Sequence, residues 1–411
     1  MVFLRIGLLS FGGPAAQIAL MHRMLVEETG WLSERQFLNA LNFCMLLPGP
    51  EAMQLATYAG WRLHGLVGGL IAGLLFVLPG AMVIFVLATL YVTFGDVPLV
   101  DTLFLGVKAA VLIIVLEALL RVSKRALKGA AHWVIAGLAF VGIFFLSLPY
   151  PLIVLAAGLY GAVFAQKAGI ADRPPKVSTS IQRTFATFTL GTAIWLVPVL
   201  VFDFVTGGAI LGALGIFFSK LAVVTFGGAY AVLAYMAQVV VTEFGWVTPD
   251  EMLDGLGLAE TTPGPLILVT QFVGYIAAFR DGGYLLAFAG GLVTLWATFV
   301  PCFLWIFTFA PYIEWISAQP RLDGALKAIT AAVVGVILNL SVWFGLHVLF
   351  QTVEQNVIGP LTLWTPEPSS LDLRALILAG ISGGLLLRAH LGIGWVLVIS
   401  AMLAWILAAL F

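Results

Sequence analysis

One stretch near the N-terminus of this chain occurs a second time, and the repeat limits the possible folds more than any other feature. Three landmarks recur at a constant spacing, since 226−11, 246−31 and 263−48 all equal 215: Phe11-Gly12-Gly13, Trp31 and Pro48-Gly49-Pro50 return as Phe226-Gly227-Gly228, Trp246 and Pro263-Gly264-Pro265. Aligned without gaps, residues 3–50 match residues 218–265 at 16 of 48 positions. A period this long indicates duplication of a half-protein rather than a short solenoid repeat.

Both copies interrupt apolar sequence with glycine and proline, which favours broken helices. We expect a break at 12–14, a helix over 33–46 with Ser33 as its N-cap, and a new helix that starts at Glu51. The second copy predicts broken segments at 208–241 and 250–280. Such half-helices or re-entrant pieces are tolerated in a membrane only where they are buried in protein or line a cavity. Interrupted segments at matching places in two halves favour a secondary transporter, with its binding site where they meet.

Composition indicates an integral membrane protein. Mean hydropathy is +1.09, 62% of the residues are hydrophobic and 9% are charged, whereas soluble domains carry about 25% charged residues. The net charge of −1 carries no information about nucleic acid, and no basic tract suggests such a partner, so none is expected. The two cysteines and five histidines show no metal-ligand spacing, so we expect no metal and no cofactor. No Ser/His cluster, aspartate pair or His-rich set lies within the spans, so we do not expect an enzyme.

The predicted fold is an all-α polytopic membrane protein built from two homologous repeats of inverted topology. The first repeat covers 1–167, a hydrophilic cytoplasmic connector 168–183, an extra linking span 184–205, and the second repeat 206–411. The single extra span makes the second repeat enter the membrane from the other face. Lysines and arginines after the 103–120 span and in the connector mark the cytoplasmic side. Conventional spans are expected near 66–92, 103–120, 131–148, 150–167, 284–310, 324–350, 373–389 and 391–411.

Two pairs of cations are repeated in an otherwise weakly charged chain. Arg5 corresponds to Lys220, each six residues before Phe-Gly-Gly, and Lys108 corresponds to Lys327. Ionisable residues in membrane spans are rare and often functional. Inverted repeats would gather these four cations around one pseudo-two-fold axis, where they would suit an anion. The alternative is that they extend to the membrane interface from helix ends.

The glycine and proline motifs can present bare backbone N–H groups and helix N-termini to an oxyanion. The alternative is close packing of helices through small residues. With the four cations, the candidate substrate-binding residues are Gly12, Gly13, Pro14, Pro48, Gly49, Pro50, Gln54, Gly227, Gly228, Thr262, Pro263, Gly264, Pro265 and Gln271.

Glu51 and Glu260 are the candidate proton carriers, because a carboxyl group removed from water binds a proton more readily. The alternatives are a first-turn acid for Glu51 and an ion-pair partner of a nearby Lys or Arg for Glu260.

These motifs, Ser10-Phe11-Gly12-Gly13-Pro14 and Leu46-Leu47-Pro48-Gly49-Pro50-Glu51 followed by Gln54-Leu55-Ala56, resemble the chromate ion transporter family in its long, two-domain form. The resemblance implies proton-motive-force-driven export of chromate across the inner membrane, with sulfate as a competitor. The expected mechanism is alternating access, with the two halves rocking about the bound anion. Two departures are Ala229 in place of the second motif proline, and Met53 where a polar residue is expected. A transporter of sulfate or another oxyanion and an anion channel remain alternatives. The oligomeric state is open, a homodimer included.

Overall fold

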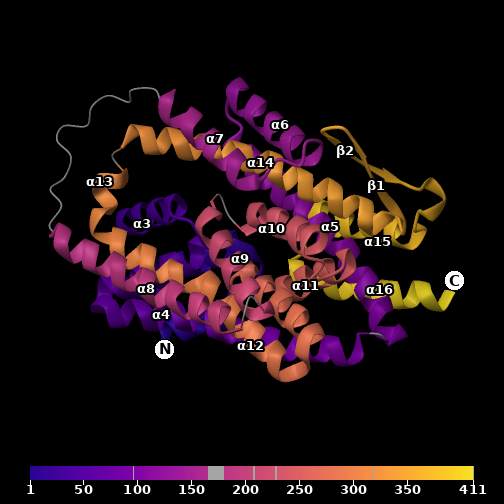
Figure 1. The fold of residues 1–411 in the computed structure, drawn as a ribbon, viewed down its shortest axis with the longest axis horizontal. Coiled ribbons are helices and arrows are strands. Elements are labelled where there is room, and N and C mark those ends of the chain that lie inside the picture. Colours follow the sequence, from indigo (N-terminus) through magenta and orange to yellow (C-terminus); the bar gives the residue numbers. More distant parts are fainter. Residues whose placement is uncertain (96, 165–179, 207–208, 227–228, 318, 411) are drawn as a thin grey trace.

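The computed structural model describes residues 1–411 except 96, 165–179, 207–208, 227–228, 318 and 411. Helices make up nearly all of it (Figure 1). The first half contains α1 (Val2–Leu9), α2 (Gly13–His22), η1 (Arg23–Glu28), α3 (Glu34–Leu46), α4 (Glu51–Phe94), α5 (Pro98–Ala126), α6 (Ala130–Phe144) and α7 (Tyr150–Val163). The second half contains α8 (Ile181–Thr206), α9 (Ile210–Val224), α10 (Ala229–Gln238), η2 (Val239–Glu243), α11 (Pro249–Thr261), η3 (Leu266–Leu268), α12 (Val269–Phe309), η4 (Ala310–Tyr312), α13 (Ile313–Ser317), α14 (Pro320–Leu349), β1 (Val353–Ile358), β2 (Leu361–Pro366), η5 (Pro368–Ser370), α15 (Leu373–Gly383), η6 (Gly384–Arg388) and α16 (Ile393–Leu410).

The predicted helix breaks are confirmed. Between α1 and α2 the chain leaves the helical conformation, and Gly12 and Gly13 have φ angles of 85° and 79°. The Ser33 side chain accepts a hydrogen bond from the backbone N–H of Gln36, whose side chain accepts one in return from the Ser33 N–H. Thr248 and Glu251 form the same capping box at the start of α11. Both copies of the repeat therefore begin this half-helix with the same local device.

The long helices α4 and α12 are each folded back on themselves. Gly65 and Gly283 leave the helical region with φ angles of 65° and 73°. A Cβ on Gly60 would lie 2.3 Å from the carbonyl oxygen of Gly68, eight residues along the chain, and one on Gly290 would lie 2.4 Å from that of Gly274. A straight helix would separate residues eight apart by about 12 Å. Each element is therefore a short half-helix packed on a longer span, with glycines at the contact.

The helices form two layers with shorter pieces between them (Figure 1). In one layer α4 packs on α1 and α12, and α12 also packs on α8 and α9. In the other layer α5 and α14 pack together. Helices α6 and α7 of the first half cover α14 of the second, while α15 and α16 of the second half cover α5 of the first. The two halves are thus interlocked.

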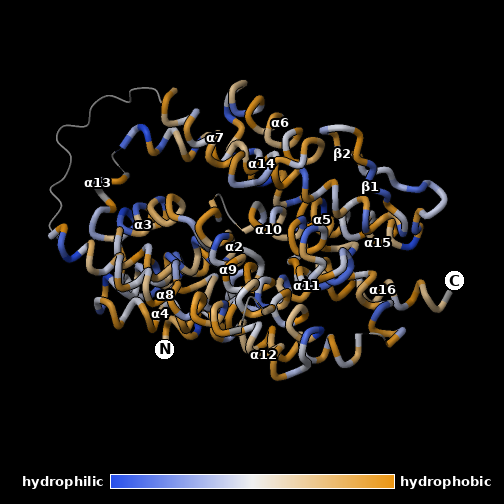
Figure 2. The backbone as a smooth tube through the Cα atoms, in the orientation of Figure 1, coloured by the Kyte–Doolittle hydropathy of each residue, from blue (hydrophilic) through white to orange (hydrophobic). Residues whose placement is uncertain are grey.

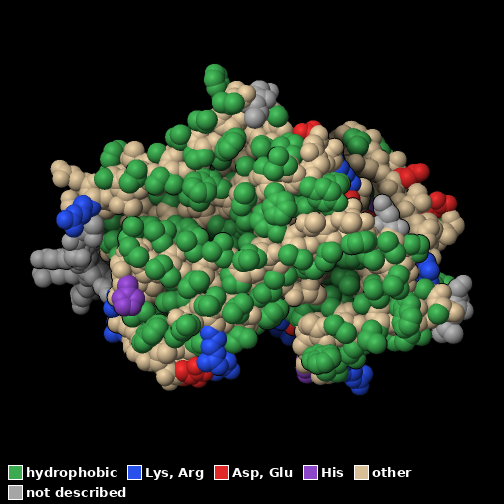
Figure 3. Space-filling model, turned by 90° about the horizontal axis from the view of Figure 1, so that it is seen from below, with side chains coloured by type: hydrophobic (Ala, Val, Ile, Leu, Met, Phe, Trp, Pro, Cys, Tyr) green, Lys and Arg blue, Asp and Glu red, His purple; other side chains and the backbone are tan. Residues whose placement is uncertain are grey.

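The chain is a multi-pass membrane protein. Helical stretches long and apolar enough to cross a membrane occupy 51–94, 98–126, 181–205, 266–312 and 320–349 in the part of the chain that the structure describes. Apolar residues run along most of the backbone (Figure 2), and hydrophobic side chains cover the face seen in Figure 3, with charged ones mainly at its margins. The fold class expected from composition is confirmed.

The structure differs from the expectations at two places. Helix α6 has 15 residues and is shorter than the span expected at 131–148, because the chain turns at Phe145–Pro149. Helix α7 has 14 residues and ends at Val163, before the end of the span expected at 150–167. The loop after α14 contains an antiparallel hairpin, β1 and β2, which the sequence analysis did not predict. Most of the 168–183 connector lies outside the described residues.

Candidate functional site

Each Pro-Gly-Pro motif is bonded to the helix break of the opposite half. The backbone N–H of Gly49 donates to the carbonyl oxygen of Thr225 at 2.8 Å, and the N–H of Gly264 donates to the carbonyl oxygen of Ser10, also at 2.8 Å. Both 264−49 and 225−10 equal 215, so the same contact is made twice with the halves exchanged. The broken segments singled out by the sequence are therefore brought together at the contact between the halves.

Glycine is required at these crossings by its conformation and by the lack of space. Gly49 has a φ of 121° and Gly264 a φ of 103°, where residues with a side chain are strained. A Cβ on Gly49 would also lie 2.8 Å from the Gln54 amide nitrogen and 2.9 Å from the Cys302 sulfur. The prolines on either side carry no N–H, so each motif leaves carbonyl oxygens to be bonded by other groups.

Buried amide side chains bond those carbonyls. The Gln54 Nε2 donates to the Pro48 carbonyl at 2.7 Å, and the Gln17 Nε2 donates to the Gly264 carbonyl at 2.7 Å. A third buried glutamine, Gln271, donates instead to the carbonyl of Ala81 in α4, at 2.9 Å. The Oε1 atoms of Gln54 and Gln271 are buried without a hydrogen-bond partner in the described structure. Sequence reasoning missed Gln17, because it considered the polar neighbours of the Pro-Gly-Pro motifs and Gln17 lies outside them, in α2.

The two candidate proton carriers lie in different surroundings. Glu260 is buried, and the hydroxyl of Tyr230 donates to its Oε1 at 2.7 Å, so its nearest partner is a phenol rather than the Lys or Arg considered from the sequence. A Cβ on Gly13 would lie 3.8 Å from that hydroxyl, so Tyr230 links Glu260 to the start of α2. Glu51 is the first residue of α4 and lines a large cavity.

That cavity, called the basic vestibule below, encloses about 520 Å³ between the start of α4 and the ends of α3, α5, α6 and α14. It reaches the surface at the exposed Met45 and Lys327 and extends inward to Gly49. Its ionisable lining is mostly cationic or neutral: Arg125, Lys128, His132 and Lys327, with Glu51 and Asp323 as the acids. Three sequence candidates therefore share one cavity: Gly49, Glu51 and Lys327.

The remaining candidates do not share one environment. Lys108 is buried and its Nζ lies 2.8 Å from Asp250 and 3.7 Å from Asp254, whereas Lys327 is exposed and pairs with Asp323 on its own helix at 2.6 Å. Arg5 and Lys220 are exposed on α1 and α9. Pro14 is the second residue of α2, and Pro50 directly precedes α4. Thr262 follows α11, and its hydroxyl donates to the carbonyl of Leu258. Pro263 and Pro265 lie on either side of Gly264. Gly227 and Gly228 lie outside the described residues.

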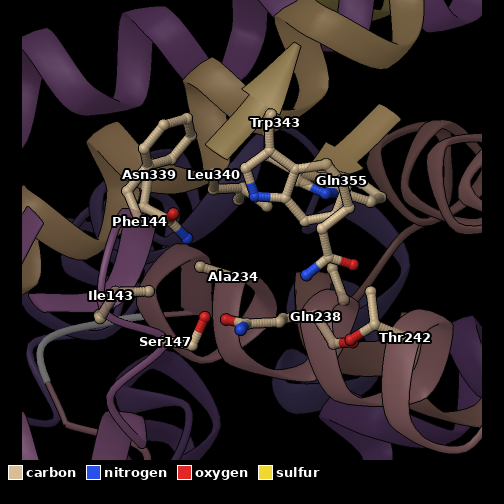
Figure 4. A pocket seen from close by; sticks show the side chains of 12 residues that line it. Ile143, Phe144, Ser147, Ala234, Gln238, Thr242, Asn339, Leu340, Trp343 and Gln355 are labelled. Carbon is tan, nitrogen blue, oxygen red and sulfur yellow. The ribbon is translucent and has the colours of Figure 1, made fainter. Parts of the chain in front are cut away.

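A second, much smaller cavity of about 30 Å³ lies further along two helices that also line the vestibule. On α14 the vestibule ends at Thr330 and the small pocket begins at Asn339, about 13 Å away at 1.5 Å per residue. Polar side chains from several elements face it, among them Gln238, Asn339 and Gln355 (Figure 4).

The β-hairpin borders this small pocket and is bonded to the α6–α7 turn. The Thr362 N–H donates to the Phe145 carbonyl at 2.7 Å, and the hydroxyls of Thr362 and Ser147 are 2.9 Å apart. Gln355 of β1 and Trp364 of β2 line the pocket. The hairpin therefore acts as a cover at this end of the molecule.

Comparison with known proteins gives consistent matches along the chain. The family model described as "Chromate transporter" matches residues 1–162 and 212–406. The "Chromate transport protein" of Pseudomonas aeruginosa is 35% identical over 347 residues, which are 82% of this chain and 77% of that protein. That of Cupriavidus metallidurans is 31% identical over 339 residues, 82% and 79% of the two chains. The "Probable chromate transport protein" of Synechococcus elongatus is 28% identical over 384 residues, 93% of each. No solved structure matches.

Proposed function

We propose that this chain, which belongs to the chromate transporter family, carries chromate across the membrane and exports it from the cytoplasm. Relatives named as chromate transport proteins, similar along most of their length, support the substrate. The observation that carries the proposal is the basic vestibule, which leads from the surface to the backbone of Gly49. A cavity lined by cations concentrates anions near its inner end.

The architecture behind this proposal is a pair of inverted repeats, 1–167 and 206–411, joined through the extra span at 184–205. The reciprocal hydrogen bonds of Gly49 and Gly264 support it, because a pseudo-two-fold axis between the halves generates one from the other. The packing of α1 on α4 in the first half and of the matching α9 on α12 in the second half also supports it. Substrate would then bind where the broken helices cross, near the motif residues named above.

The vestibule is proposed as the cytoplasmic entrance. Arg125 and Lys128 in its wall belong to the Lys/Arg cluster at the C-terminal end of α5, and such clusters favour the cytoplasmic side. Glu51 lies at the inner end, where a charged carboxylate and a dianion repel each other. Protonation of Glu51 would remove that repulsion and so favour chromate at the inner end of the vestibule.

Alternating access is proposed from the unequal cavities. The vestibule holds about 520 Å³ at one end, while the opposite pocket holds about 30 Å³ beside the β-hairpin. This arrangement corresponds to a state open towards the cytoplasm. Opening of the hairpin end with closure of the vestibule would complete a transport cycle.

The test is chromate uptake into inverted inner-membrane vesicles that contain the full chain, with and without a pH gradient, and with sulfate as competitor. We expect gradient-dependent uptake that exceeds the uptake of vesicles without the protein. Chromate uptake that does not depend on the pH gradient and is accompanied by an electric current would instead indicate an anion channel. No chromate uptake, with sulfate or another oxyanion transported, would refute the chromate assignment.

A matched pair of variants tests the vestibule. Lys128 and Lys124, four residues earlier, are both exposed, but only Lys128 lines the vestibule. Removing one cation about 6 Å from a dianion costs roughly 1 kcal/mol in a wet cavity, so Lys128→Ala should raise the apparent KM for chromate about 3- to 10-fold. Lys124→Ala should change it less than 2-fold. Equal effects of the two substitutions would contradict the vestibule as the entrance.

A further inference from the structure

A second charged cluster, away from the vestibule, joins the two halves of the chain at Lys108. Its ammonium group on α5 lies 2.8 Å from Asp250 and 3.7 Å from Asp254, both on α11. The Lys108 and Asp254 side chains are only 11% and 6% exposed, whereas that of Asp250 is 69% exposed. Among the ion pairs of the described residues, Lys108–Asp254 is the one with both members nearly enclosed. Its cost in desolvation calls for a functional reason.

The two oxygens of Asp254 are not equivalent. The hydroxyl of Tyr91, at the end of α4, donates to Oδ2 at 2.8 Å. Oδ1 is buried and accepts no hydrogen bond in the described structure, and Lys108 approaches it only to 3.7 Å. A buried acceptor without a donor is costly. Protonation of Oδ1 would remove the negative charge of the enclosed carboxylate, which is costly to keep out of water.

The repeat shows that this cluster exists in one half only. The counterpart of Asp254 is Asn39, since 254−215 equals 39, and an amide does not take up a proton in this way. The counterpart of Lys108 is Lys327, whose partner Asp323 lies on its own exposed helix surface. One half thus has a titratable group enclosed beside a lysine, and the other half has an open, cationic cavity.

We propose that Asp254, held between Lys108 and Tyr91, is the carboxyl group that binds and releases the coupling proton. This inference rests on the proposed function and names a coupling residue that the sequence did not single out. The step is simple: one O–H bond forms at Oδ1 when a proton arrives and breaks when it leaves, with no redox change. Asp250, exposed one helical turn away, connects the site to solvent.

The surrounding charges come from every element packed on α11 that has an ionisable group near the cluster. They are Tyr91 of α4, Asp101 of α5, Asp250 and Glu251 of α11, Arg280 of α12, which is paired with Glu251, and His347 of α14. Helix α16 has no ionisable residue within 393–410. Lys108 is the cation closest to Asp254, so its ion pair is the one that changes when Asp254 gains or loses a proton.

Helix α5 can transmit the change. Lys108 ties α5 to α11, and Arg125, 17 residues later on α5, lines the vestibule about 25 Å away. While Asp254 is charged, Lys108 has two carboxylates on α11. When Asp254 is protonated, one attraction is lost and α5 is held less firmly. The proton therefore biases the position of a helix that also forms the wall of the vestibule.

The test uses the full chain in liposomes and two assays: chromate–chromate exchange at equal pH, and chromate accumulation driven by a pH gradient. Chromate-dependent proton movement is followed with a trapped pH dye. Asp254→Asn should keep exchange within about 3-fold of the native chain and lose at least 10-fold of the driven accumulation and of the proton signal. Asp281→Asn, the same substitution at an exposed acid, should leave both assays unchanged.

Two further variants guard against a folding defect and a merely structural role. Lys108→Met with Asp254→Leu removes both buried charges, so the protein should fold and exchange chromate without proton coupling. Tyr91→Phe removes a donor that favours the charged form of Asp254, so the pH profile of driven transport should move to higher pH.

Three results would overturn the inference. The first is gradient-driven accumulation that persists in a folded Asp254→Asn variant. The second is loss of both chromate exchange and driven accumulation in that variant. The third is an unchanged pH profile of driven transport in Tyr91→Phe. Failure of the proposed function is recognised separately, because the native chain itself would then show no chromate exchange.

Discussion

The approach of α4 to the second Pro-Gly-Pro motif depends on the absence of a side chain at Gly80. A Cβ built there would lie 2.0 Å from the carbonyl oxygen of Pro263 and 2.5 Å from a methyl carbon of Leu268. Real Cβ atoms essentially never come closer than 3.0 Å to such a neighbour, so Gly80→Ala requires a separation of at least 3.0 − 2.0 = 1.0 Å. The Pro263 carbonyl belongs to the backbone and cannot rotate away as a side chain can.

The cost follows from this displacement. Overpacking a closely packed interior costs about 1–3 kcal/mol. If residues 263–265 move by 1 Å, the 2.8 Å hydrogen bond from Gly264 to Ser10 is lost, for about 1 kcal/mol more. Alanine regains about 1 kcal/mol through its higher helix propensity. The net destabilisation is therefore about 1–3 kcal/mol, centred on the proposed substrate site.

The assay compares melting in detergent and chromate uptake for Gly80→Ala and Gly137→Ala. A Cβ at Gly137, inside α6, would meet no atom within 4 Å, so the same chemical change there should be neutral or slightly stabilising. We expect the melting temperature of Gly80→Ala to fall by roughly 2–10 °C and its chromate uptake to fall at least 5-fold. Native-like melting and uptake in Gly80→Ala would refute the packing argument, as would an equal loss in Gly137→Ala.

Two further predictions concern the Tyr230–Glu260 hydrogen bond and the contact between the β-hairpin and the α6–α7 turn. Tyr230→Phe leaves the buried Glu260 carboxylate without its donor and should cost about 1–3 kcal/mol in thermal stability; the exposed Tyr284→Phe serves as the control, and similar melting of the two variants would contradict a role for the bond. Ser147→Cys with Thr362→Cys should form a disulfide under oxidation, because the two hydroxyls are 2.9 Å apart, and chromate uptake should stop and return on reduction. Uptake that continues with the disulfide formed would show that the hairpin does not need to open.

The sequence predicted the local breaks well because they are local. Proline lacks the N–H of a helical hydrogen bond and glycine disfavours the helix through its conformational freedom, wherever they stand. The cap at Ser33 needs only the residues that follow it. The contact of Gly49 with Thr225 could not be predicted, because it depends on how two distant halves pack. The β-hairpin was missed because β1 and β2 lie in a polar loop with only weak alternation of apolar residues.

The duplication was an incomplete guide to functional residues, because a search for repeated positions misses residues that occur in one copy only. It selected residues that are alike in both copies, such as Lys108 and Lys327. Some residues that distinguish the halves were singled out, as Glu51 and Glu260 were, but Asp254, which corresponds to Asn39, and Tyr230, which corresponds to Ala15, were not. A transporter with one substrate site needs such differences, because coupling requires the two halves to respond differently to one proton.

The reciprocal bonds of the two proline motifs also have a consequence for biosynthesis. Gly49 leaves the ribosome 225 − 49 = 176 residues before Thr225, the residue that accepts its N–H. At about 5–20 residues per second, that interval lasts roughly 9–35 s. During it, the first half is already in the bilayer with a polar group that no local segment can satisfy. The nascent half-protein must therefore be shielded, by the insertion machinery or by water drawn into the unfinished cavity, until its second half is made.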